Sequence, residues 1–193
     1  MTDINFKSPI TSSASNLKQI EIKETEAVGE TPLPYDLIEL LFFAYRDFTR
    51  DPDDALAEFD FGRAHHRVLH FVDRNPGIMV TDLLSILRIT KQSLGRVLKQ
   101  LVDAGIIEQR EGSHDRRQRL LYTTERGHTL AIDLTRLQQK RLERAQIDLP
   151  DGSEEIIRKF LLQMIDPEAR QEIVKIIRSS FDLIDYSKPD QNK

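Results

Sequence analysis

Three side chains that can bond the edges of DNA bases, Gln92, Arg96 and Lys99, recur at helical spacing. An apolar stripe shares the same segment and consists of Leu94, Val97, Leu98 and Leu101. At about 100° per residue, the polar side chains lie almost opposite this stripe. Glutamine can bond adenine, and arginine or lysine can bond guanine, in the major groove. We therefore expect a helix that reads bases with its exposed face, while Lys91, Ser93 and Gln100 contact phosphate.

A second polar cluster lies in the segment EGSHDRR, between two strand-like segments. In this cluster Asp115 is followed by Arg116 and Arg117. An arginine at a hairpin tip has the right size and charge for a narrow minor groove, whose negative potential is enhanced. Asp115 can hold one arginine in a single rotamer. The alternative is a solvated loop, but the basic helix before the loop favours DNA binding.

The elements that position these clusters follow the order helix, helix, strand, loop, strand. Thr81 is expected to cap a helix over residues 82–87. Thr90 is expected to cap the base-reading helix, and Gly105 to end it. Strands are expected over residues 106–110 and 118–122. This order is that of a helix-turn-helix with a wing, and it points at double-stranded DNA.

Longer helices flank this unit. Amphipathic spacing predicts a helix over residues 35–50, which ends at Asp51-Pro52 and is followed by a turn-rich segment. Further helices are expected over residues 63–73, 125–147 with Thr124 as its cap, 154–165, and 167–183 with Asp166 as its N-cap. The apolar stripes of the terminal helices are too many for a winged helix of roughly 60 residues to bury alone. A homodimer is therefore expected, and the alternative is a bundle within one chain.

The predicted fold class is mainly α with a small β-wing. A winged helix-turn-helix is flanked by N-terminal and C-terminal dimerisation helices. The predicted parts are a flexible N-terminal arm (1–32), an N-terminal dimerisation helix and loop (33–60), the winged helix-turn-helix DNA-binding domain (61–123), the C-terminal dimerisation helices (124–186) and a disordered tail (187–193).

Charge is distributed unevenly along the 193 residues, whose net charge is −4. Between Arg88 and Arg119 there are eight basic and four acidic residues, so this window carries +4 and the rest of the chain −8. A positive face on an acidic body docks on phosphate in one orientation, because its other surfaces are repelled.

Composition excludes several kinds of protein. The chain has no cysteine, which excludes disulfides, cysteine-ligated metal sites and thiol switches. There is no run of about 18 apolar residues that could span a membrane, and we expect a cytoplasmic protein. Glycine-rich phosphate loops, nucleophile elbows and HExxH motifs are also missing. We therefore expect no enzyme and no cofactor; a winged helix that binds proteins instead of DNA is the alternative function.

Two histidines, His66 and His70, have the i, i+4 spacing that can share a metal ion. The pair lacks a third ligand nearby on the same face. A surface or interface pair is therefore favoured over a metal or haem site.

Three segments resemble the MarR (multiple antibiotic resistance regulator) family of winged-helix transcription factors. The first is LLSILRITKQSLGRVLKQLVDAGIIEQ, the second is Asp115-Arg116-Arg117 and the third is Tyr122 to Gly127, with the sequence YTTERG. The resemblance covers about residues 37–142. The chain departs from the family pattern in its 32-residue arm and in the break at Asp166-Pro167.

The resemblance implies an intertwined homodimer on a palindromic DNA site, with half-sites about 10 base pairs apart. It places Gln92, Ser93, Arg96 and Lys99 on the recognition helix, Arg117 at the wing tip and Asp115 as its support. It also implies that a small aromatic effector binds between the dimer helices and the winged helix. The DNA is then released as the two reading heads move apart. Candidate effector residues include Phe43, His66 and His70, although most such aromatic residues belong to protein cores.

Overall fold

The computed structural model describes residues 33–112 and 118–179. The elements in chain order are α1 (Tyr35–Leu56), the 3₁₀ turn η1 (Ala57–Phe59), α2 (Arg63–Arg74), β1 (Ile78–Met79), α3 (Val80–Leu87), α4 (Lys91–Asp103), β2 (Ile107–Glu111), β3 (Arg119–Thr123), α5 (Glu125–Gln146), α6 (Ser153–Gln163) and α7 (Pro167–Ser179). The predicted fold class, mainly α with a small sheet, is confirmed. Within these residues every helix is too short or too polar to span a bilayer.

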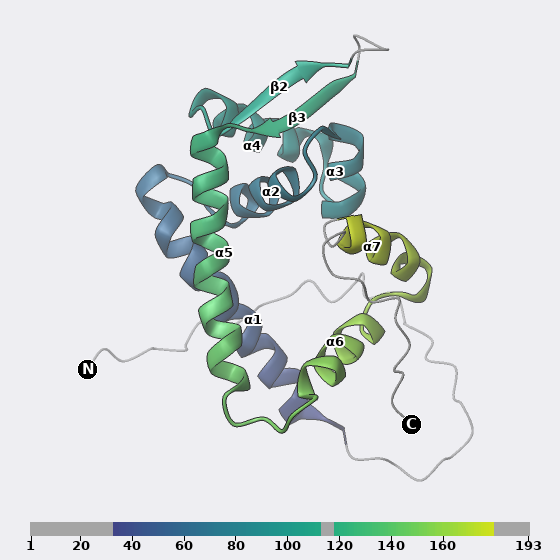
Figure 1. Ribbon diagram of the computed structural model, residues 1–193. Coiled ribbons are helices and arrows are strands. Elements are labelled where there is room, and N and C mark those ends of the chain that lie inside the picture. Colours follow the sequence, from purple (N-terminus) through teal and green to yellow (C-terminus); the bar gives the residue numbers. More distant parts are fainter. Residues whose placement is uncertain (1–32, 113–117, 180–193) are drawn as a thin grey trace, which may run out of the picture.

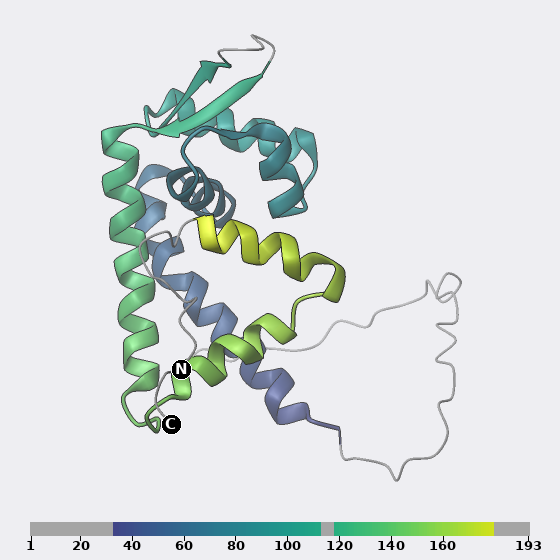
Figure 2. The same ribbon diagram turned by 45° about the vertical axis from the view of Figure 1, so that its right-hand side comes forward.

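The elements form a head and a stem (Figure 1). The head consists of α2, α3, α4 and the sheet, and α5 runs from the sheet down the stem, where it packs against α1. From the far end of α5, the helices α6 and α7 return to the underside of α3 (Figures 1 and 2). The head therefore connects to the stem both through α5 and through α7.

The sheet is antiparallel, with strand order β1-β3-β2. In the centre, Leu121 of β3 pairs with Ile78 on one side and with Gln109 on the other. Strands β2 and β3 each begin one residue later than predicted. Ile106 precedes β2 because its backbone amide bonds the carbonyl of Leu101 and ends the turn after α4.

The predicted break at Asp51-Pro52 is wrong, because α1 continues to Leu56 with Pro52 inside it. A proline inside a helix removes one backbone hydrogen bond. Here Pro52 and Leu56 are both buried, so the apolar contacts of this last turn offset that loss. The turn-rich segment shrinks to the residues after η1, where Asp60 has a φ of 55°.

The predicted cap at Thr81 is also wrong. Helix α3 begins at Val80, and its N-cap is Met79, whose backbone amide donates to Oδ2 of Asp82 at 3.4 Å. Met79 is extended because it pairs with Leu120 of β3. The extended residue of the strand is therefore the cap of the helix, and no loop separates the two.

Three other residues that were expected to cap or end a helix do so. Oγ1 of Thr90 accepts the amide of Ser93 at 3.1 Å, and Oγ1 of Thr124 accepts the amide of Gly127 at 3.0 Å. Gly105 follows the C-cap of α4 with a φ of 67°, a conformation that suits glycine.

Candidate DNA-binding surface

Helix α4 has one buried and one exposed face, as predicted. Its apolar stripe, Leu94, Val97, Leu98 and Leu101, is buried in the head. The stripe packs in one core with Leu69 of α2, Leu83 of α3 and Leu121 of β3. All six predicted contact residues of this helix are exposed: Lys91, Gln92, Ser93, Arg96, Lys99 and Gln100. Because the core fixes the rotation of α4, their side chains face solvent together.

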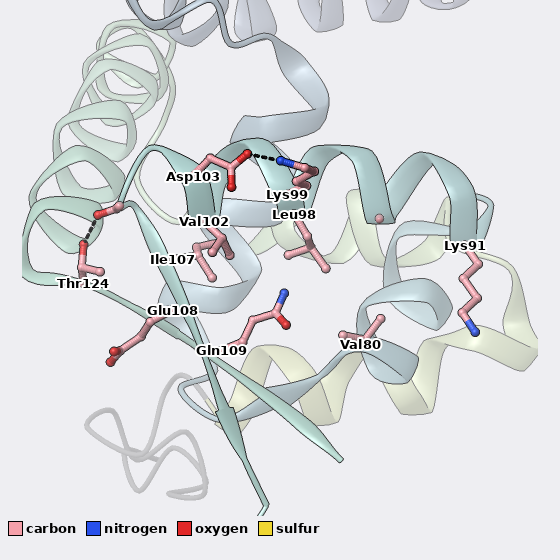
Figure 3. A pocket seen from close by; sticks show the side chains of 12 residues that line it. Val80, Lys91, Leu98, Lys99, Val102, Asp103, Ile107, Glu108, Gln109 and Thr124 are labelled. Atoms are coloured by element: carbon pink, nitrogen blue, oxygen red, sulfur yellow. Dashed lines mark hydrogen bonds and ion pairs between the residues drawn. The ribbon is translucent and has the colours of Figure 1, made fainter. Parts of the chain in front are cut away.

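The exposed face is shaped by two side-chain contacts. Lys99 forms an ion pair with Asp103 one turn further along α4 (Figure 3). This pair is exposed, so it contributes little stability and yields readily to a stronger anion. Gln100 lies 2.9 Å from Nε2 of His65, measured from its Oε1 atom. Gln100, a predicted phosphate contact, is therefore tied to α2 within this chain, and the predicted base-reading set of Gln92, Arg96 and Lys99 is unaffected.

The N-terminus of α4 can attract phosphate. Thr90 caps it, while Lys91 and Ser93 occupy its first turn. The first amides of a helix and its dipole favour an anion at this end. The turn before this helix contains Arg88, which has a φ of 50°. The Arg88 side chain pairs with Asp166, with 3.4 Å between Nη1 and Oδ2, so Lys91 is the positive side chain beside the first amides of α4.

A hollow of about 740 Å³ lies between α4 and β2 (Figure 3). Lys91, Gly95 and Lys99 line it from the helix, and Gln109 lines it from the strand. A Cβ atom added to Gly95 would meet nothing within 4 Å in this chain. Crowding inside the chain therefore does not require this glycine, and the flank of α4 stays open for close approach.

The wing is described only at its base, and Asp115, Arg116 and Arg117 lie outside the described residues. At the base, Arg110 lies over the ring of Tyr122, with 4.4 Å between the guanidinium carbon and the ring centroid. Arg110 also pairs with Glu108, and Nη1 of Arg119 lies 3.0 Å from Oε1 of Glu111. Sequence reasoning missed these cross-strand and same-strand pairs. They orient both arginines along the wing.

The histidine pair is not a surface pair, since only 8% of His66 is exposed. The His66 and His70 rings meet edge to face, with 6.4 Å between their centroids. Burial lowers the pKa of both histidines; the positive charge of His70 adds to this effect at His66, and that of Arg74 at His70. Among the described residues, no three histidine or acidic side chains are grouped to hold a metal.

The third candidate effector residue lies in different surroundings. Phe43 is 53% exposed on α1, and the Arg46 guanidinium lies 4.9 Å from its ring centroid. The structure thus places Phe43 on the surface of the stem and the histidines within the head. Its role as an effector residue, like theirs, stays a prediction.

Comparison with known proteins decides the family. A model described as MarR family matches residues 59–118, which span α2 to the wing. The chain is also 46% identical over 134 residues to the HTH-type transcriptional regulator PetP of Rhodobacter capsulatus, covering 69% of this chain and 81% of that protein. The chain belongs to the MarR family. The predicted resemblance is confirmed, and membership agrees with the expectation that the protein is not an enzyme.

Solved MarR-family structures share the fold. FabT of Streptococcus pneumoniae, solved in complex with DNA, has a TM-score of 0.61 at 16% identity, covering 67% of this chain and 93% of that chain. A MarR transcriptional regulator from Methanosarcina mazei Go1 has a TM-score of 0.58 at 22% identity, covering 67% and 94%. These likenesses show a shared overall fold.

Proposed function

We propose that this MarR-family regulator binds a palindromic operator in double-stranded DNA as a homodimer. The observation that carries the proposal is the division of α4 into a buried apolar face and an exposed face with Gln92, Arg96 and Lys99. An α-helix fits the major groove, where these side chains distinguish base pairs. The related fold of FabT was solved with DNA, which supports the same use of this one. Such a role belongs in the cytoplasm.

The exposed apolar faces of the stem helices support binding of a second copy of the chain. Helices α1 and α6 expose large apolar side chains, namely Tyr35, Leu37, Leu40, Phe42, Phe43, Ile156, Phe160 and Leu161. A monomer rarely exposes so many apolar groups together, because their burial is favourable. We infer that two chains cover these faces mutually. This dimer presents two heads to two half-sites, about one helical turn apart.

The wing completes each head. Arg117, supported by Asp115, is proposed to enter the minor groove, and Arg116 to contact the backbone. At the other end of α4, Lys91 and Ser93 are proposed to bind phosphate with the helix amides. Each half-site is then held through both grooves.

An effector role is the second part of the proposal. A small aromatic molecule near Phe43, His66 and His70 would alter the angle between stem and head and release the DNA. The support is that these residues belong to α1 and α2, which pack against each other between stem and head.

Selection of genomic fragments with the purified protein tests the function. We expect one enriched palindrome, with an affinity that falls steeply as salt rises, because phosphate contacts release counterions. Random DNA of equal length is the control. Failure to enrich any sequence, together with salt-independent binding, would contradict the proposal and favour the protein-interaction alternative.

A further inference from the structure

The C-terminal end of α4 meets the N-terminal end of α5 directly. Thr124, the N-cap of α5, donates its hydroxyl to the carbonyl of Gly105 at 2.7 Å. Its backbone amide donates to the carbonyl of Ile106 at 3.1 Å. The same hydroxyl accepts the amide of Gly127 at 3.0 Å. One side chain therefore serves the end of one helix and the start of the other.

Arg126 and Gly127 complete this junction. Nη1 of Arg126 donates to the carbonyl of Ala104, the C-cap of α4, at 3.1 Å. A cation at a helix C-terminus is favourable because the dipole is negative there. A Cβ atom on Gly127 would lie 2.0 Å from the carbonyl oxygen of Ile106. The backbones approach so closely that only glycine fits.

These hydrogen bonds supply the directionality that apolar packing lacks. Helix α2 packs against both α4 and α5, so the core already holds the two helices near each other. Apolar attraction is non-directional, however, whereas a hydrogen bond requires a defined angle and distance. The core determines which face of α4 is buried, and the junction adds directional contacts that fix the tilt of α4 relative to α5.

We propose that Thr124, Arg126 and Gly127 are positioning residues that clamp α4 to α5. The 22-residue α5 spans about 33 Å of stem, and the clamp makes its upper end rigid with the base-reading helix. A change in the tilt of α5 then reaches α4 undiminished. For DNA the consequence rests on the proposed function: the clamp sets which spacing between half-sites the dimer accepts.

A distance measurement tests the clamp without DNA. The chain has no cysteine, so Gln92→Cys and Lys140→Cys place one spin label on α4 and one on α5. Excess unlabelled protein restricts the signal to distances within one chain. We expect a narrow distance distribution that broadens in Thr124→Val and is restored in Thr124→Ser. A distribution in Thr124→Val as narrow as in the unsubstituted background would overturn the clamp.

Two further variants separate the clamp from general damage. Gly127→Ala forces the Ile106 carbonyl to move, whereas Gly62→Ala, where an added Cβ meets nothing within 4 Å, is its matched control. Arg126→Gln removes the charged donor at an exposed position and keeps the test decisive should Gly127→Ala fail to fold. We expect broadening in Gly127→Ala and Arg126→Gln but not in Gly62→Ala. If the distance distributions of all three variants are equally broad, the inference is wrong.

A second experiment measures DNA binding, on the selected operator with one or two base pairs inserted or deleted between its half-sites. In Thr124→Val the preference for the best spacing should fall at least about two- to tenfold, because the lost hydroxyl makes two hydrogen bonds and the loss of one alone is expected to cost that much. An unchanged preference despite broadened label distances overturns the transmission to DNA. If the unsubstituted protein binds no sequence specifically, the proposed function fails instead, and the label distances still decide the clamp.

Discussion

Arg141 of α5 and Asp51 of α1 form an ion pair with two parallel hydrogen bonds. The distance from Nε to Oδ2 is 2.8 Å, and the distance from Nη2 to Oδ1 is also 2.8 Å. Their side chains are only 20% and 30% exposed, so water screens the pair less than it screens a surface pair. This contact joins the two stem helices within one chain, beyond the position where sequence reasoning ended α1.

Replacing Arg141 should therefore destabilise the protein. We expect Arg141→Met to lower the free energy of unfolding by about 1–3 kcal/mol, because Asp51 loses its partner in a half-buried setting. Urea unfolding at one fixed protein concentration measures the effect. The matched control is Arg136→Met, whose pair with Asp133 is exposed. Equal losses in both variants would show that the stem pair is no stronger than a surface pair.

Arg96 should carry base discrimination. We expect Arg96→Ala to reduce the preference for operator over random DNA by about 1–3 kcal/mol, because Arg96 is exposed on the face of α4 that is proposed to read base edges. Titrations on both DNAs at one salt concentration measure this preference. Arg136→Ala, on the exposed surface of α5, should leave it unchanged. Equal weakening on both DNAs would place Arg96 among the phosphate contacts.

Arg117 should act through the minor groove. Its place in the Asp115-Arg116-Arg117 segment leads us to expect that Arg117→Ala weakens binding most on operators with A·T-rich flanks, where that groove is narrow. Affinities on operators with A·T-rich and G·C-rich flanks measure the difference. If the variant binds both operators with the affinity of the unsubstituted protein, the proposed role of Arg117 in the minor groove is wrong.

Dimerisation should depend on the exposed face of α1. Leu40 is 62% exposed in the single chain. We expect Leu40→Glu to weaken the dimer at least about tenfold, because each copy loses the burial of one leucine, worth about 1.5–3 kcal/mol. Sedimentation over a range of concentrations measures the dissociation constant, with Gln139→Glu, which adds the same single negative charge at an exposed position of α5, as the control. An unaltered dimer in Leu40→Glu would place the interface elsewhere.

Acid should destabilise the head through His66 and His70. Burial lowers the pKa of both below the ordinary value of 6.5, so the folded protein prefers their neutral forms. Their contribution to stability is present above that value and is lost as the pH falls through the lowered pKa. Urea unfolding between pH 8 and 5 should show this loss, and the double variant His66→Gln, His70→Gln should flatten it. If the free energy of unfolding of the double variant falls with pH as steeply as that of the unsubstituted protein, other groups cause the acid sensitivity.

Local signals in the sequence predicted the termini whose partners lie within a few residues. Thr90 and Thr124 cap helices with their own hydroxyls, and Gly105 adopts the left-handed conformation that it was expected to adopt. These features depend on short-range sterics and hydrogen bonds, which the residues nearby in the sequence determine where no distant contact overrides them.

Distant contacts set the features that the sequence did not reveal. Pro52 stays inside α1 because the core around Leu56 favours one more turn, and Met79 replaces Thr81 as a cap because β3 holds it extended. Similarly, Gln100 is tied to His65, which lies 35 positions away in the chain. The roles of the DNA-contacting residues depend on a partner molecule, and they stay predictions.

The absence of a loop between β1 and α3 has a consequence for how the protein leaves DNA. Met79 belongs to the sheet that carries the wing and is also the cap of the first helix of the helix-turn-helix. The wing base and the first reading helix are therefore joined without a hinge between them. If each head holds both grooves as proposed, we expect it to release a half-site in a single step, so that intermediates differ in the number of heads attached.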